Sequence, residues 1–360
     1  MEKGFFVKEI QEGVAVAGYF IVQQGMEKTT RKGQLYWDLL VADATGSIAV
    51  KVWKPKLGEN VPTGGDVLKI QQAKAEVYNG TPQLRLEEYI RLSTDEAAIL
   101  PREWFCAKSA RNSSEMWEEL TTIIEQHMTP RWTALAKSVF ANPSLKAAFM
   151  TSAAAKEVHH AYAHGLLEHS LGVVRLALKM GECYHFLNLD LLIAGALFHD
   201  LGKIQTYEQT LQISVTDAGK LIGHAVLGVL MLEPYLVKSE LTVEEQLQLK
   251  HLILSHHGQP EFGACQLPMT SEAIVLHFID DIDAKMAICV KALQNVPTGE
   301  WTHPIFALDK RSLLAAPLIP QSVTESEGKK NRGKRAKPKE GEEDCFALLR
   351  VSMDQERPRS

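Results

Sequence analysis

Residues 195–203 read GALFHDLGK, an apolar run that stops at His199 and Asp200, with Lys203 about one helical turn further on. Burying an imidazole or a carboxylate without a partner is costly, so these side chains need compensation. A bound cation would compensate both groups. The simpler interpretation is an ordinary helix end with a polar last turn, and the rest of the chain must decide between the two.

Composition sets broad limits. The 360 residues are 45% hydrophobic and 23% charged, which is ordinary for a globular protein of two or three domains. The net charge of −5 means that any nucleic-acid binding must come from local patches. The five cysteines are scattered without a CxxC pair, and no apolar run is long enough to span a bilayer. We therefore expect a soluble cytoplasmic protein without a disulfide framework, zinc ribbon or membrane segment.

Residues 1–92 show the pattern of β-structure. Short apolar runs such as GVAVAGYFIVQQ and LYWDLLVAD alternate with turns, including Ala44-Thr45-Gly46 and Asn79-Gly80. Five short strands predict an OB-fold, a small β-barrel whose second and third strands form a face that binds oligonucleotides.

From Asp95 the periodicity becomes helical, as in SSEMWEELTTIIEQHM. We expect a helical connector over residues 93–150 and an all-α domain over 151–315. Beyond Pro320 the chain is charged and almost without apolar residues, so residues 316–360 are predicted to be a disordered tail.

Histidines gather in this helical domain. A single buried histidine is usually a core residue with a hydrogen-bond partner, but several on apolar helices of one bundle favour a shared role. They are His159, His160, His164, His169, His199, His224, His251, His256, His257 and His277.

Imidazoles mixed with carboxylates suit Mn, Fe, Co or Ni, with Mg less natural. Asp200 is short enough to bridge two ions while His199 binds one of them. Two ions can clamp a phosphodiester and activate a water for attack on phosphorus. Lys203 is then placed to meet the negative charge of the phosphate.

The order of LEHS, FHDLGK, GHAVLG, LSHHG and HFIDDIDAK over about residues 155–290 resembles the HD superfamily of metal-dependent phosphohydrolases. Together with the predicted barrel, AAAKEVHHAYAHGLLEHS and ILSHHGQPEFG resemble more narrowly the YhaM family of 3′-to-5′ exoribonucleases, over residues 1–315.

The resemblance implies a ligand set for two metal ions: His169, His199, Asp200, His224, His256 and Asp280. His257 remains an alternative because the His-His pair leaves the register open. Asp281 and Asp283 are weaker rivals to Asp280, and Asp283 could equally pair with Lys285.

Three further histidines of this region carry weaker expectations. His159 and His160 are expected to line the entrance or to orient the ligands, unless they form a surface pair. His164 stands where the family usually has glycine, which could narrow the pocket or change the metal set.

Nucleic-acid binding by the barrel would use aromatic and basic side chains. The predicted set is Tyr36, Trp53, Lys51, Lys54 and Arg85, with Phe20, Trp37, Tyr78, Lys56, Lys69 and Lys74 near them. Alternation places Tyr36 and Trp37 on opposite faces, so one of the two is expected in the core. Barrel filling is an equally good interpretation of Trp37 and Trp53.

The resemblance implies a metal-dependent 3′-to-5′ exoribonuclease that releases nucleoside monophosphates from single-stranded RNA or, alternatively, single-stranded DNA. Manganese is the expected ion, with Co, Fe, Ni or Mg as alternatives, and a homo-oligomer is left open. An HD phosphohydrolase acting on a small nucleotide, with the barrel as a regulatory module, is the alternative function. A third is a nucleic-acid-binding protein with a structural metal site.

Overall fold

The computed structural model describes residues 2–30, 32–53, 55, 58–155, 160–209, 211, 213–294 and 296–316. Two of the predicted site residues, Lys54 and His159, lie outside the described residues, as do Lys56 and the predicted tail from residue 317 onward.

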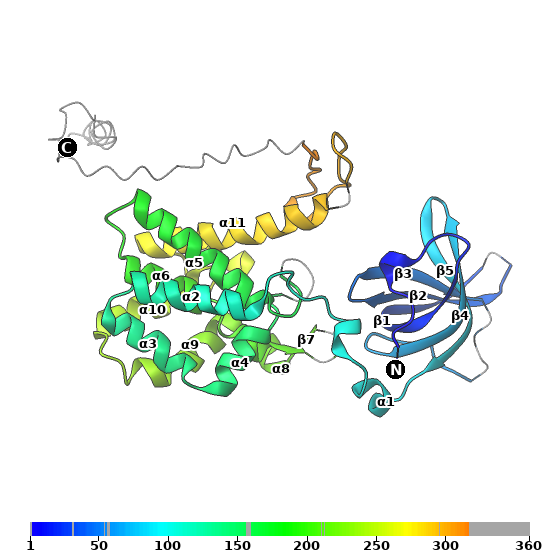
Figure 1. The fold of residues 1–360 in the computed structure, drawn as a ribbon, viewed down its shortest axis with the longest axis horizontal. Coiled ribbons are helices and arrows are strands. Elements are labelled where there is room, and N and C mark those ends of the chain that lie inside the picture. Colours follow the sequence, from blue (N-terminus) through cyan, green and yellow to red (C-terminus); the bar gives the residue numbers. More distant parts are fainter. Residues whose placement is uncertain are drawn as a thin grey trace, which may run out of the picture. The chain divides into compact units, whose positions relative to one another are not determined.

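A closed five-stranded barrel forms the N-terminal part of the chain (Figure 1). Its strands are β1 (Ala15–Thr29), β2 (Leu35–Asp43), β3 (Gly46–Val52), β4 (Val67–Tyr78) and β5 (Thr81–Arg91). They pair in the order β1-β2-β3-β5-β4, with β3 and β5 parallel and the other pairs antiparallel. This five-stranded closed arrangement confirms the predicted OB-like barrel.

Strand alternation separates the inside of the barrel from its outside. Trp37, Leu39 and Val41 of β2 are buried in the barrel core. Tyr36 and Asp38 alternate with them along the strand, lie on the outer face and are half-buried. Trp37 is therefore the core member of the Tyr36–Trp37 pair, as side-chain alternation along a strand requires.

Helices dominate the rest of the described chain. They are α1 (Thr94–Ala98), α2 (Ser113–His127), α3 (Pro130–Phe140), α4 (Pro143–Thr151), α5 (Gly165–Cys183), α6 (Leu189–Phe198), α7 (Lys203–Thr206), α8 (Asp217–Leu221), α9 (His224–Leu236), α10 (Val243–Ser255) and α11 (Ser271–Leu293). Short 3-10 turns occupy Val7–Glu9, Arg102–Trp104, Pro260–Phe262 and Phe306–Leu308.

Capping residues in the sequence fix where several of these helices begin. The side chains of Asn112, Asn142 and Asn188 accept hydrogen bonds from backbone N–H groups in the first turns of α2, α4 and α6. Thr242 and Glu245 form a capping box at the start of α10.

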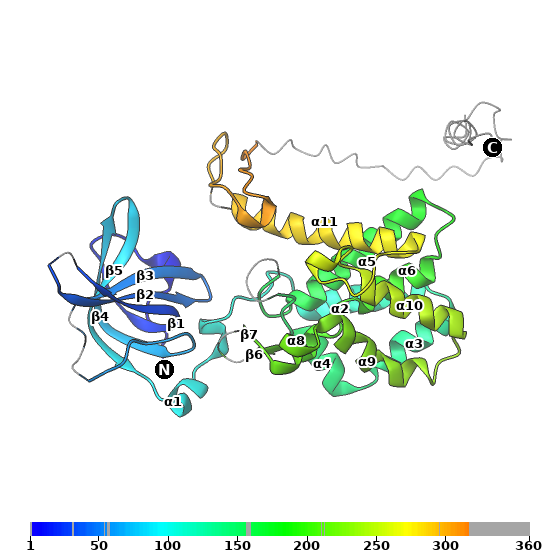
Figure 2. The same ribbon diagram turned by 180° about the vertical axis from the view of Figure 1, so that it is seen from behind.

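α6 is the central helix of the helical domain. Every residue from Leu191 to Phe198 is buried, because α6 contacts α2, α3, α5, α10 and α11. α11 runs along α5 in both views (Figure 1, Figure 2). A helix that is apolar on all sides belongs in the interior of a bundle, and its C-terminal end therefore delivers His199 and Asp200 into that interior.

One detail differs from the expectation of a purely helical domain. Two short strands, β6 (Tyr207–Gln209) and β7 (Ile213–Val215), form an antiparallel hairpin between α7 and α8. Three-residue strands are too short to show an alternating pattern in the sequence. No helix among the described residues is both long and apolar enough to cross a membrane.

Candidate metal centre

Five helices bring imidazole and carboxylate groups to one place inside the bundle. The residues come from the middle of α5, the C-terminal ends of α6 and α10, the first residue of α9, and the middle of α11. They are His169, His199, Asp200, His224, His256, His257 and Asp280.

The first group contains His169, His199, Asp200 and Asp280. His169 Nε2 lies 3.0 Å from Asp280 Oδ1 and 3.4 Å from Asp200 Oδ2. His199 Nε2 lies 3.3 Å from Asp200 Oδ2 and 3.6 Å from Asp280 Oδ1. Ligands bonded to one ion at about 2.0–2.2 Å lie about 3.0–3.6 Å from one another, so this donor set fits a single divalent cation.

The second group contains three histidines and the other oxygen of Asp200. His224 Nε2 lies 3.3 Å from His256 Nε2 and 3.0 Å from His257 Nε2. Asp200 Oδ1 lies 3.4 Å from His224 Nε2 and 3.7 Å from His256 Nε2. The spacing again fits one cation, and both residues of the His256–His257 pair contribute to it.

Asp200 lies between the two groups, with Oδ2 facing the first and Oδ1 facing the second. Its side chain is fully buried, and neither oxygen accepts a hydrogen bond of normal geometry from the described residues. Lys203 Nζ lies 2.6 Å from Oδ2 and is itself buried. A buried carboxylate with this little hydrogen bonding would suit a ligand position with a cation on each side of it.

Backbone carbonyls determine which ring nitrogens are available as ligands. His199 Nδ1 lies 3.0 Å from the carbonyl oxygen of Ala196, and His256 Nδ1 lies 2.7 Å from that of Ile253. A carbonyl can only accept, so each Nδ1 carries the proton and each neutral ring presents a lone pair at Nε2. This is the arrangement that orients histidines bound to metals.

The short distance between the Nε2 atoms of His169 and His199 indicates that a positive charge is needed between or on them. His169 Nε2 and His199 Nε2 are 3.1 Å apart, while His169 Nδ1 lies 2.8 Å from Asp283 Oδ2. Two neutral rings with lone pairs at these positions would repel each other. The contact needs a positive charge, either a proton on His169 or a metal ion bound by both rings.

A hydrogen-bonded chain extends from His169 to the edge of the domain. Asp283 Oδ2 also contacts His160 Nε2 at 3.0 Å, and His160 Nδ1 lies 2.8 Å from the hydroxyl of Tyr162. That hydroxyl donates to Glu168 Oε2 at 3.0 Å. Asp283 therefore orients His169, and His160 and Tyr162 hold Asp283 in turn.

The electrostatic environments of the two groups differ. Burial disfavours the imidazolium of His169, but the neighbouring carboxylates of Asp200, Asp280 and Asp283 outweigh burial and raise its pKa well above the ordinary value. Burial also opposes the charge of Asp200, yet Lys203 and the imidazoles hold its pKa well below the usual range. A place where carboxylates favour a bound proton also favours a divalent cation.

In the second group burial dominates. It lowers the pKa of His224 to about 3 and also lowers the pKa values of His256 and His257. These rings are therefore neutral near pH 7, which is the form that binds metals.

Two glycines without chemistry of their own make the site possible. A Cβ on Gly172 of α5 would lie 2.2 Å from Asp283 Oδ1, and one on Gly202 would lie 1.9 Å from the carbonyl oxygen of His224. Gly172 thus leaves room for Asp283, and Gly202 lets the turn after Asp200 pack against the start of α9. Sequence reasoning did not single out either glycine, nor Tyr162 and Glu168, because only the three-dimensional contacts reveal their roles.

Two expectations about neighbouring residues are corrected. Lys285 pairs with Asp281 at 2.6 Å on the surface of α11, so Asp283 is not its partner. His164 does not join the described groups that could hold a metal ion. It caps α5 with a φ of 70°, and its Nδ1 donates to the carbonyl oxygen of Met150 at 2.7 Å. A left-handed conformation favours glycine, and this hydrogen bond holds a histidine there instead.

The described residues predicted for a binding face lie on the outer surface of the barrel. Tyr36 and Trp53 are both half-buried, and their rings stack with centroids 4.8 Å apart. Lys51 Nζ lies 6.0 Å from the Tyr36 ring and contacts Asp38 at 2.5 Å. Arg85 pairs with Glu87.

The other aromatic and basic residues considered for this face differ in position. Phe20 is buried in the barrel core, as Trp37 is. Tyr78 and Lys74 are exposed, while Lys69 Nζ lies 5.7 Å from the ring of Tyr19.

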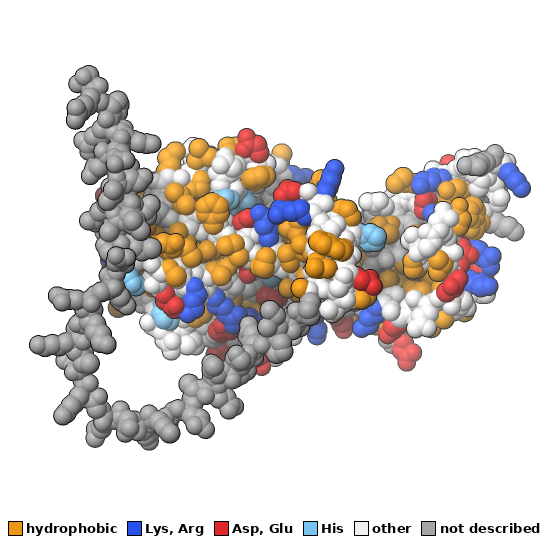
Figure 3. Space-filling model, turned by 90° about the horizontal axis from the view of Figure 1, so that it is seen from above, with side chains coloured by type: hydrophobic (Ala, Val, Ile, Leu, Met, Phe, Trp, Pro, Cys, Tyr) orange, Lys and Arg blue, Asp and Glu red, His pale blue; other side chains and the backbone are white. Residues whose placement is uncertain are grey.

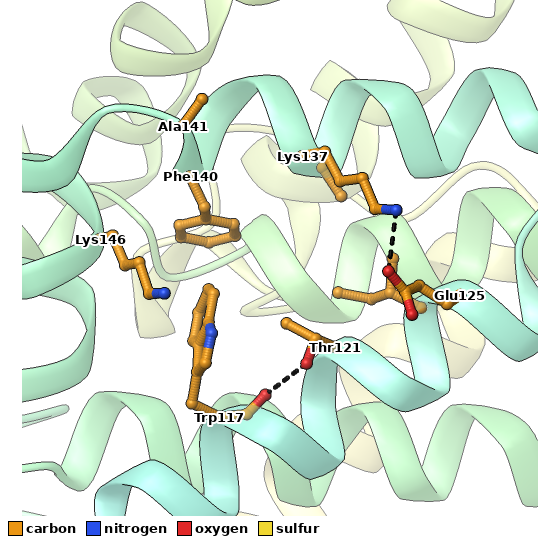
Figure 4. A pocket seen from close by; sticks show the side chains of 9 residues that line it. Trp117, Thr121, Glu125, Lys137, Phe140, Ala141 and Lys146 are labelled. Atoms are coloured by element: carbon orange, nitrogen blue, oxygen red, sulfur yellow. Dashed lines mark hydrogen bonds and ion pairs between the residues drawn. The ribbon is translucent and has the colours of Figure 1, made fainter.

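A separate pocket of about 230 Å³ lies between α2, α3 and α4 (Figure 4). Trp117 and Phe140 face each other there, with Lys146 beside Trp117, and Lys137 pairs with Glu125 at 2.8 Å. No residue of the metal-binding groups lines this pocket. This pocket is therefore separate from the histidine cluster.

The fold and the cluster define a class, and the comparison with known proteins agrees. The HD domain family matches residues 166–285, which include all seven residues of the two groups. The cluster is thus the candidate metal site of an HD domain, and HD-domain chemistry implies dependence on a divalent metal.

Relatives along most of the chain narrow the class to one family. The 3′-5′ exoribonuclease YhaM of Bacillus subtilis is 32% identical over 312 residues, which cover 87% of this chain and 98% of that protein. YhaM of Oceanobacillus iheyensis is 31% identical over 315 residues, with 87% and 96% covered. The chain belongs to the YhaM family of 3′-5′ exoribonucleases. The predicted family and enzyme class are confirmed.

Solved structures add only a weak likeness for the barrel. The second OB-fold domain of replication protein A from Methanococcus maripaludis is 15% identical, with a TM-score of 0.21, and the match covers 25% of this chain and 95% of that one. A TM-score this low supports no conclusion, so the barrel is identified from its own strand order.

Proposed function

We propose that this chain degrades single-stranded RNA from the 3′ end, releasing nucleoside monophosphates, at a centre that holds two divalent cations. The observation that carries the proposal is the convergence of imidazole Nε2 atoms from four helices on the two oxygens of Asp200. The direction of degradation and the choice of RNA rest on the names of the relatives, which are 3′-5′ exoribonucleases.

The donor sets favour a particular kind of ion. Each group combines imidazoles with one or two carboxylates, a mixture that suits Mn, Co or Fe better than Mg. We propose manganese in both positions, with His169, His199, Asp200 and Asp280 holding one ion and Asp200, His224, His256 and His257 holding the other. When bound, divalent ions held by these residues would supply the positive charge needed to polarise a phosphodiester and to acidify an attacking water.

The chain's own residues keep this arrangement ready. Lys203 holds Asp200 ionised through their 2.6 Å contact, and burial on all sides prevents the carboxylate from turning away. Asp283 fixes the proton of His169 on Nδ1, which leaves Nε2 free to bind. We assign Lys203 to this positioning role in addition to the phosphate contact expected from the sequence.

We propose that residues 1–92 grip the RNA strand and that residues 151–315 hydrolyse it, with residues 93–150 connecting them. The stacked Tyr36 and Trp53 rings offer an aromatic surface for bases, and Lys51 and Arg85 offer charge for the backbone. Base stacking and charge attraction hold a strand without reading its sequence, which suits an enzyme that moves along RNA.

The experiment uses the full chain with Mn²⁺ and a 5′-labelled single-stranded RNA resolved on a gel. We expect a ladder of shortening 5′-labelled products and release of nucleoside monophosphates. Asp200→Ala should abolish the ladder but retain RNA binding in a filter assay. Asp217→Ala is the matched control, since Asp217 lies exposed on α8 and outside the cluster.

Two results would overturn the proposal. One is a wild-type protein, loaded with Mn²⁺, that leaves RNA intact while hydrolysing small nucleotides. The other is Asp200→Ala with unchanged RNA cleavage, which would remove the bridging carboxylate from the reaction.

A further inference from the structure

We propose that two copies of this chain form a homodimer through the outer surface of α11. The interface centres on a ridge of five apolar side chains, here called the α11 ridge: Ile274, Phe278, Ile282, Met286 and Val290. Their exposed fractions are 47%, 57%, 47%, 54% and 72%.

The α11 ridge is continuous because its members are four residues apart. Side chains at this spacing stand next to one another along a helix and form one of the ridges by which helices pack. The residues that serve the metal centre do not belong to it. Asp280 points about 160° away from Ile282 around the helix, since each residue turns about 100°.

The α11 ridge exposes a large apolar area for the surface of a single chain. The exposed fractions correspond to roughly 500 Å² per chain, near the upper end for the largest apolar patch of a monomer. Figure 3 shows hydrophobic side chains gathered over the face that includes α11. Two such ridges together would bury about 1,000 Å², the size at which a specific interface begins.

The order of side chains favours a second copy as the occupant. Read in either direction, the ridge alternates a β-branched residue with a larger one: Ile, Phe, Ile, Met, Val. An antiparallel pair about a twofold axis at Ile282 therefore places Phe278 against Met286 of the partner subunit, a favourable contact between sulfur and an aromatic ring. Ile274 then meets Val290 of the partner subunit, and Ile282 meets its own copy.

Charges beside the ridge are compatible with the same symmetry. Asp281 and Lys285 form an ion pair at 2.6 Å along one flank of the ridge, and both side chains are about two-fifths exposed. In the antiparallel pair, the order along this flank is Lys285, Asp281 of the partner subunit, Asp281, and Lys285 of the partner subunit. Each lysine therefore lies near both carboxylates, while the two carboxylates face each other across the axis. The ridge itself carries no cation, which makes it a poor surface for nucleic acid.

The first test measures the mass of the full chain in solution by sedimentation over micromolar concentrations. We expect the mass of two chains for the wild type and that of one chain for Ile282→Glu. Leu247→Glu is the control, since Leu247 is 67% exposed on α10 and lies outside the ridge. It should remain dimeric. Circular dichroism and bound metal should be unchanged in both variants, because neither residue contacts the cluster.

The second test fixes the register. In a background with the native cysteines replaced by serine, since Cys183 and Cys265 are exposed, Ile282→Cys should give a dimer on a non-reducing gel under mild oxidation with diamide, which takes up the two electrons and two protons of the thiols. Ile274→Cys should not, because it faces Val290 of the partner subunit rather than its own copy. A monomeric wild type, or a dimer that Ile282→Glu leaves intact, overturns the proposal whatever else covers the ridge. Equal crosslinking at both positions overturns the antiparallel register. Activity enters neither test, so failure here leaves the exoribonuclease proposal standing.

Discussion

Replacing Asp283 with alanine tests how the first metal position is held. Asp283 binds no cation in our assignment, but its Oδ2 is within hydrogen-bond distance of two imidazole nitrogens. His169 Nδ1 lies at 2.8 Å and His160 Nε2 at 3.0 Å. Without the carboxylate, His169 can carry its proton on Nε2 and its ring can turn. Removing such a supporting partner typically lowers metal affinity 10–100-fold, which corresponds to about 1.4–2.7 kcal/mol.

A calorimetric titration of the metal-free protein with Mn²⁺ measures this loss of metal affinity. The Mn²⁺ affinity of the first position should fall. The affinity of the second position, held by His224, His256 and His257, should stay the same. Asp283→Asn is the graded control, since an amide oxygen can still accept from His169 Nδ1, and we expect a smaller loss. Unchanged affinity in Asp283→Ala, or equal weakening at both positions, would refute the reasoning.

Three other perturbations give distinct outcomes. Gly172→Ala should favour the helix by about 1 kcal/mol, yet its Cβ would displace Asp283, so Mn²⁺ affinity should fall in calorimetry; retained affinity would contradict this. Because the pKa of His169 is raised in the folded state, its imidazolium stabilises the metal-free protein, and this contribution is complete below about pH 6.5. The contribution is lost as the pH rises through the folded-state pKa. Mn²⁺ affinity should rise over the same pH range because metal and proton compete, and a pH-independent affinity would count against His169 as a ligand. Trp53→Ala should weaken RNA binding by about 1–3 kcal/mol, measured by fluorescence anisotropy, without slowing hydrolysis of a small phosphodiester; slowed hydrolysis would place Trp53 elsewhere in the mechanism.

Much of the barrel was predictable from local patterns. Alternation placed Tyr36 and Trp37 on opposite faces, and the Asn79-Gly80 pair marked the tight turn between β4 and β5. The parallel pairing of β3 with β5 was not predictable, because it joins segments that no turn connects.

Less of the candidate site than of the barrel could be predicted from the sequence. Buried imidazoles and carboxylates on several helices indicated a shared role, and the resemblance to the HD superfamily implied which of them form the ligand set. The sequence could not decide whether Asp283 faces the histidines or pairs with Lys285, because both are possible for residues this close on one helix. Only the packing of α11 on α5 shows that Asp283 faces inward to His169 while Asp281 remains on the surface.

The most direct measurement is crystallography of the protein grown with Mn²⁺, using anomalous scattering at the manganese edge to locate the ions. We predict two peaks per chain, one on each side of the Asp200 carboxylate, with His169 and His199 at the first and His224 at the second. A single peak that does not touch Asp200, or none in a folded protein, would contradict the account.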